Sequence, residues 1–122
     1  MATVVIGYVT RAEGGAALSA GLEEARRRDA KVVLVHGSEG DRGADLETAR
    51  SALGGAGLAH EVRDLSAGDE VSDVLIAAAE DTGAELIVIG LRRRSPVGKL
   101  ILGTNAQRVL LDAPCPVLTV KP

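Results

Sequence analysis

One stretch of the chain, Gly90–Thr104, combines residue types that suit an anionic ligand. It begins with a glycine and ends with Gly103, and glycine lets the backbone approach a ligand closely. If a helix starts at Thr104, its hydroxyl can serve as the N-cap, and the free N–H groups of the first turn favour an anion. Four cations add positive charge that suits phosphate oxygens: Arg92, Arg93, Arg94 and Lys99. Spacing alone leaves two readings equally open, a phosphate site or two turn glycines beside solvated arginines.

Other reactive side chains give weaker signals. His36 follows an apolar run and could act as a general base, but no nucleophile motif accompanies it, which favours a hydrogen-bonded histidine at a strand end. His60 is expected to face water, and the two histidines show no metal-ligand spacing. Cys115 is the sole cysteine, so we expect a small buried residue in preference to a redox sensor. Three carboxylates could bring Mg²⁺ towards a phosphate, although solvated charges are the commoner case: Asp41, Asp45 and Glu47.

The composition excludes several classes of protein. With 122 residues and a formal net charge of −3, the sequence predicts one domain over residues 1–122 and argues against a protein that coats nucleic acid. Tyr8 is the only aromatic residue, so single-stranded bases would find no stacking platform. No apolar run approaches the roughly 18 residues of a membrane span, and the N-terminus lacks the pattern of a secretory signal. We therefore expect a cytoplasmic protein that binds neither nucleic acid nor membrane.

The elements that must position these residues follow from hydrophobic patterning. Four runs are apolar at nearly every position, as in strands buried on both faces: Thr3–Ile6, Lys31–Val35, Leu86–Ile89 and Val117–Val120. A fifth run, Leu58–Arg63, alternates in part and predicts a polar edge strand.

Helical periods separate the strands. They include Ala17–Ala25, a segment from Leu46 that ends at Gly54-Gly55, a segment from Val71 that stops at Gly83, and one with Ala106, Val109 and Leu110 that cannot pass Ala113 because Pro114 follows. Strict alternation of strand and helix predicts a three-layer α/β/α, Rossmann-like fold with an open parallel five-stranded sheet. Ligands of such sheets bind beyond the carboxyl ends of the strands.

The chain resembles the universal stress protein family over its whole length. The nucleotide-binding branch of that family has a glycine, two residues, a second glycine, nine residues, and a third glycine followed by serine or threonine. Gly90 matches the first glycine and Gly103-Thr104 the last pair, whereas Arg93 stands in place of the second glycine. The segments Val32–His36 and Ala113–Val117 are also similar to that family.

The resemblance implies a sheet with strand order 3-2-1-4-5, a role in stress tolerance, and binding of ATP or AMP, with Mg²⁺ accompanying it. It also implies a homodimer paired through the last strand, Val117–Val120. The implied nucleotide-binding residues are Val9 and Gly37 at the base, Ile89 and Gly90 at the ribose, and Gly103, Thr104 and Asn105 at the phosphates, with Arg92 and Arg93 beside them. Val9 replaces the aspartate that the family has after its first strand.

Three functions remain open from the sequence. The first is a regulatory module that senses an adenine nucleotide or another anion through Gly90–Thr104. The second is a dimeric interaction protein of the same family whose pocket binds no nucleotide, which Val9 and Arg93 favour. The third is a weak ATP hydrolase, which has the least support because no evident base or nucleophile lies in these loops.

Overall fold

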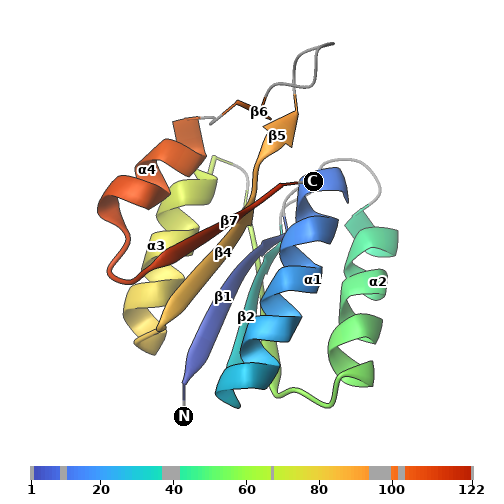
Figure 1. The fold of residues 1–122 in the computed structure, drawn as a ribbon. Coiled ribbons are helices and arrows are strands. Elements are labelled where there is room, and N and C mark those ends of the chain that lie inside the picture. The colour runs from blue at the N-terminus through green and yellow to red at the C-terminus, as the bar shows by residue number, and fades with distance from the viewer. Residues whose placement is uncertain are drawn as a thin grey trace.

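A computed structural model describes residues 2–8, 11–36, 42–66, 68–93, 100–101 and 104–121 of the chain. The strands of the main sheet are β1 (Thr3–Tyr8), β2 (Lys31–His36), β3 (His60–Asp64), β4 (Leu86–Gly90) and β7 (Val117–Val120). The helices are α1 (Arg11–Arg28), α2 (Arg42–Gly55), α3 (Val71–Thr82) and α4 (Thr104–Asp112). Two short strands, β5 (Arg92–Arg93) and β6 (Leu100–Ile101), lie between β4 and α4 (Figure 1).

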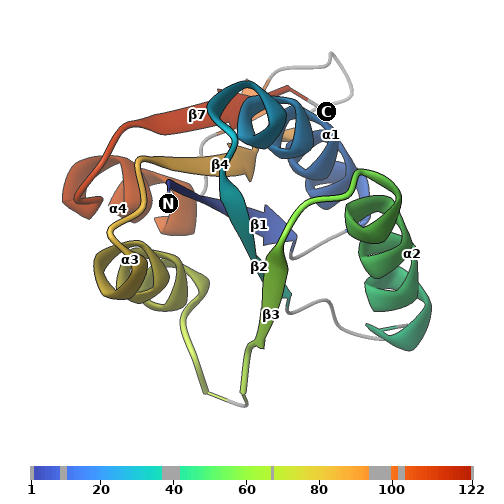
Figure 2. The ribbon, with the colours of Figure 1, turned by 90° about the horizontal axis from the view of Figure 1, so that it is seen from below.

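The main sheet has the order β3-β2-β1-β4-β7, and every neighbouring pair is parallel. Helices α1 and α2 cover one face, and α3 and α4 cover the other (Figure 2). This confirms the predicted α/β/α layers and the strand order 3-2-1-4-5, with β7 as the fifth strand of the sheet.

The apolar runs form strands because both faces of the sheet are covered. All six residues of β1 are buried, and their side chains alternate between two cores. Val4 and Ile6 pack with α1 and α2, whereas Val5 packs with α3 and α4. A strand in this environment needs an apolar side chain at every position, which is the pattern of the sequence.

The helix ends follow the predicted signals. Gly83 follows α3 with φ 62° and ψ 39°, the left-handed conformation that glycine adopts at least cost, and its N–H reaches carbonyls of the last turn. Helix α4 ends at Asp112, two residues before Pro114. Within α1, a Cβ on Gly21 would overlap the side chain of Ile6, so the absent side chain lets the helix lie close to β1.

Several details differ from the sequence prediction, among them the start of α1 at Arg11, before the expected Ala17, and of α2 at Arg42, before the expected Leu46. Strand β3 begins at His60, two residues later than expected, because Leu58 and Ala59 form the connection that precedes it. The β5–β6 pair was not predicted, since two-residue strands are too short to show an alternating pattern.

Candidate functional site

The carboxyl ends of the parallel strands gather at one end of the sheet, where ligands of this architecture bind. From β1 the chain continues to β2 on one side, while β4 lies on the other side of β1. The gap between the ends of β1 and β4 is therefore the point at which the strand order reverses. Val9 follows β1 directly and Gly37 follows β2, but both lie outside the described residues, as does Gly103.

Ile89 and Gly90 form the end of β4 at this edge. Ile89 is buried, and its side chain belongs to the core under α3 and α4. Gly90 is half-buried and pairs with Val120, and the next residue, Leu91, donates its N–H to the carbonyl of Val120 at 2.8 Å. Pairing with β7 thus fixes the start of the predicted binding stretch.

The β5–β6 pair folds the stretch back on itself. Arg92 lies opposite Ile101 and Arg93 opposite Leu100 in an antiparallel register. The chain that leaves β4 is thereby brought beside the chain that enters α4 (Figure 1). The two ends of the predicted motif, Gly90 and Thr104, consequently lie at the same end of the sheet.

Helix α4 begins at Thr104, which is exposed. Thr104 as the N-cap stays a prediction, because the residue before it lies outside the described residues. The backbone N–H groups of the first turn of α4 are groups that can receive an anion there.

Asn105, the second residue of α4, turns its side chain to the neighbouring helix. Its Oδ1 accepts a hydrogen bond from the backbone N–H of Ser72 in α3 at 3.2 Å. Sequence reasoning placed Asn105 at the phosphates and did not foresee this contact, because Ser72 is 33 positions away along the chain. This contact occupies the Oδ1 acceptor, so Nδ2 and the backbone N–H are the groups of Asn105 that can donate to an anion.

His36, at the end of β2, is a buried histidine held by a carboxylate. It is 2% exposed, its ring stacks on Tyr8 with 6.1 Å between centroids, and its Nδ1 lies 3.2 Å from Asp64 Oδ1. This confirms the predicted hydrogen-bonded histidine, although the sequence did not identify Asp64, its register partner on β3. A carboxylate at Nδ1 favours the tautomer with the proton there, leaving Nε2 as a buried acceptor that has no hydrogen-bond partner among the described residues.

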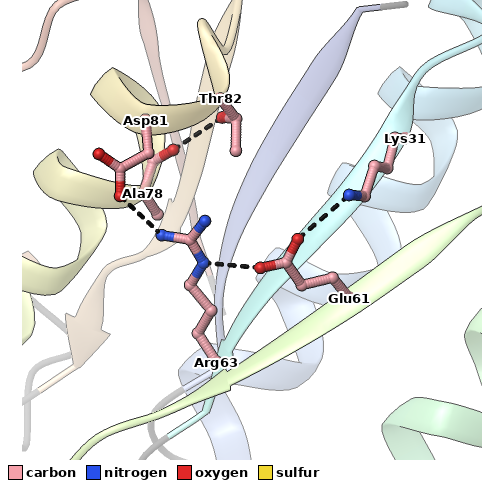
Figure 3. A network of polar contacts seen from close by, with 6 residues as sticks. All are labelled: Lys31, Glu61, Arg63, Ala78, Asp81 and Thr82. Atoms are coloured by element: carbon pink, nitrogen blue, oxygen red, sulfur yellow. Dashed lines mark hydrogen bonds and ion pairs between the residues drawn. The ribbon is translucent and has the colours of Figure 1, made fainter.

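A chain of ion pairs covers the polar edge of the sheet (Figure 3). Glu61 lies 3.1 Å from Lys31 Nζ and 2.8 Å from Arg63 Nε, and Arg63 reaches Asp81 of α3 at 3.2 Å. The hydrogen bonds from Arg63 and Lys31 lower the pKa of the Glu61 carboxyl, and the bond to Glu61 raises the pKa of Arg63. Because each charge in this chain already has a partner, the cluster serves the edge strand and not a ligand.

The remaining candidates supply no further chemistry in the described part of the chain. Cys115 is half-buried, and burial raises the pKa of its thiol, which disfavours the reactive thiolate. His60 is exposed on β3, as predicted, and Glu47 is exposed on α2, while Asp41 lies outside the described residues. Among the described residues no three His, Cys, Asp or Glu side chains converge in a way that could hold a metal ion. The described helices include none long and apolar enough to cross a membrane.

A family model, a related sequence and solved structures all match this chain to universal stress proteins. The sequence model of the universal stress protein family matches residues 1–121. A universal stress protein of Mycolicibacterium smegmatis is 42% identical to this chain over 98% of the chain and 97% of its own length. A universal stress protein structure from Archaeoglobus fulgidus has a TM-score of 0.80 and 33% identity, covering 99% of this chain and 98% of its own. Another from that organism, in complex with dAMP, has a TM-score of 0.75 and 29% identity with the same coverage.

Proposed function

Since the chain belongs to the universal stress protein family, we propose that it is a cytoplasmic stress-response module that binds an adenine nucleotide, ATP or AMP, beyond the carboxyl ends of β1, β2 and β4. Mg²⁺ would accompany the phosphates. The proposed binding residues are Val9, Gly37, Ile89, Gly90, Arg92, Arg93, Gly103, Thr104 and Asn105.

The observation that carries the proposal is the return of the chain through β5 and β6. The topology puts Gly90, at the end of β4, at the same end of the sheet as Thr104, at the start of α4, and the β5–β6 pair brings the two segments side by side. A ribose beside Gly90 would have its phosphates directed at the N–H groups of the first turn of α4. The relative of 29% identity that holds dAMP supports the choice of an adenine nucleotide.

Two residues of this chain change the expected affinity. Val9 offers no acceptor where the family has an aspartate, and loss of a charged acceptor costs roughly 1.5–3 kcal/mol, or about ten- to a hundredfold in affinity. Arg93 stands where the family has a glycine. A guanidinium carries N–H donors that can substitute for the backbone N–H donors of the glycine loop. We therefore expect binding that depends more on phosphate than on base.

The sheet edge supports a homodimer as part of this proposal. In the described part of the chain, β7 pairs with β4 on one side and with no strand on the other. Its four residues are half-buried and mostly apolar, whereas the opposite edge, β3, carries paired charges. An apolar unpaired edge favours association, and a symmetric pair of β7 strands would cover it. Light scattering should give twice the 12.5 kDa of one chain.

A thermal-shift titration with ATP, AMP and dAMP, with and without Mg²⁺, tests the ligand. A nucleotide at 100 times its dissociation constant stabilises the fold by about 2.7 kcal/mol, which raises the melting temperature by several degrees. No shift at millimolar concentration of any of the three would leave a dimeric interaction protein as the function.

A matched pair of variants locates the site. Thr104→Glu places a carboxylate in the first turn of α4, where it should stabilise the helix through the dipole yet repel a phosphate. Leu111→Glu adds the same charge near the other end of α4 at a residue that is 83% exposed. The proposal expects the nucleotide shift to disappear in Thr104→Glu and to persist in Leu111→Glu. Equal shifts in both would place the ligand elsewhere.

A further inference from the structure

Helices α3 and α4 lie side by side on one face of the sheet, and two contacts join their polar residues (Figure 1). Asn105 Oδ1 accepts from the backbone N–H of Ser72 at 3.2 Å, and Arg108 Nη2 lies 2.8 Å from Asp73 Oδ1. Asn105 and Arg108 are one turn apart on α4, and their partners are consecutive in the first turn of α3. We name this pair of contacts the α3–α4 clamp.

The contact with Ser72 satisfies a donor that α3 cannot satisfy itself. The first N–H groups of a helix have no intrahelical acceptor, and the N-cap residue of α3, Glu70, makes no side-chain cap hydrogen bond. Ser72 is 1% exposed, so water does not readily replace a lost partner. Asn105 therefore caps α3 from another helix, and its removal leaves a buried N–H without an acceptor.

The same contact fixes the start of α4. Asn105 is the second residue of that helix, and its own backbone N–H belongs to the first turn. With its side chain bonded to the backbone of α3, the first turn is held against an element whose Leu75, Ala78 and Ala79 are buried in the core. The contact between Arg108 and Asp73 is half exposed at both side chains, so water screens it and weakens its effect. Of the two contacts in the α3–α4 clamp, the one made by Asn105 is thus the contact that holds the first turn of α4 in place.

We propose that Asn105 is a positioning residue for the anion site: its Oδ1, bonded to the Ser72 N–H, sets the first turn of α4 in the orientation that receives phosphate. This inference rests on the proposed function. It makes nucleotide affinity depend on α3, an element that supplies no proposed binding residue.

Two variants remove the contact from opposite sides. Asn105→Leu keeps the approximate shape of the side chain but has no acceptor. Ser72→Pro removes the donor in the first turn of α3, where proline is best tolerated within a helix, and Ser72→Ala, which keeps the N–H, is its control. Calorimetry with dAMP should show an affinity about 2- to 10-fold weaker for Asn105→Leu and for Ser72→Pro, which is the effect of losing one hydrogen bond. Arg108→Gln should bind as the unsubstituted chain does.

Combining the two variants separates positioning from direct contact. Because both remove the same hydrogen bond, Asn105→Leu with Ser72→Pro should bind no worse than either alone. If Asn105 touched the phosphate itself, Asn105→Leu alone would lose affinity and Ser72→Pro would match Ser72→Ala. That result overturns the proposal.

Hydrogen exchange of the ligand-free protein gives a second readout, which remains usable if Ser72→Pro fails to fold. Asn105→Leu should speed exchange at the Ser72 amide and in the second turn of α4, whose N–H groups bond the carbonyls of the first turn, while leaving β1 and β2 unchanged. Lost affinity with unchanged exchange in α4 would overturn the positioning role. If the unsubstituted chain fails to bind dAMP at all, the proposed function fails first, and the titration shows this before any variant is compared.

Discussion

The close packing of α1 on β1 predicts how much an alanine at Gly21 changes the stability of the protein. A Cβ built on Gly21 would lie 2.5 Å from Ile6 Cγ1 and closer still to Cδ1, and Ile6 is fully buried. A Cβ on Gly15, in the same helix, meets nothing within 4 Å. Substitution by alanine adds the same helix propensity at both sites, about 0.8–1 kcal/mol in favour of the helix. Only Gly21→Ala also overpacks the core, at a typical cost of about 1–3 kcal/mol.

The propensity gain cancels when the two variants are compared, so their difference isolates the packing cost. Gly15→Ala should be more stable than Gly21→Ala by about 1–3 kcal/mol, which for a domain of this size corresponds to roughly 3–12 °C in melting temperature. Chemical denaturation and calorimetry both measure this. If Gly21→Ala is stabilised as much as Gly15→Ala, then α1 does not approach β1 as closely as described. In an Ile6→Val background, which lacks the Cδ1 atom, Gly21→Ala should cost less.

Three further predictions concern stability and reactivity. Hydrogen bonds from Arg63 and Lys31 lower the pKa of Glu61 in the folded state. The ionised carboxylate therefore stabilises the fold above the unfolded pKa of about 4.3, and this stabilisation is lost as the pH falls through the folded pKa. Glu61→Gln should therefore be less stable at pH 7, by up to about 1 kcal/mol, and equal to the unsubstituted chain at pH 2, as measured by denaturation at both values. Gly83→Ala should destabilise the protein by about 1 kcal/mol because the left-handed conformation strains a Cβ, whereas Gly54→Ala, with open space and no positive φ, should not. Cys115 should react with iodoacetamide at pH 7.5 more slowly than a free thiol and at the ordinary rate once the chain is unfolded, because burial raises the thiol pKa.

The strands and layers could be predicted from the sequence because burial on both faces demands a continuous apolar run. Runs such as Lys31–Val35 show this pattern directly. The end of α3 was also predictable, since Gly83 is a local signal at the position where the chain turns left-handed. The short strands β5 and β6 were not, because pairing over two residues depends on a register that no local pattern encodes.

The candidate site was predictable as a region and not as a set of contacts. Topology alone brings Gly90 and Thr104 to one end of the sheet. The partner of Asn105 is 33 positions distant and is a backbone N–H, a group that every residue type except proline offers. The partner of His36, Asp64, becomes evident only when the parallel register of β2 and β3 is known. Side-chain partners that depend on non-local packing therefore need the structure.

The central claim, an adenine nucleotide bound between the end of β4 and the start of α4, is tested most directly by a two-dimensional amide NMR titration with AMP. The account predicts saturable shifts concentrated at Ile89, Gly90, Thr104 and Asn105, with β3 and the second half of α2 unaffected. Absence of shifts at millimolar AMP, or shifts confined to residues outside this end of the sheet, would contradict it.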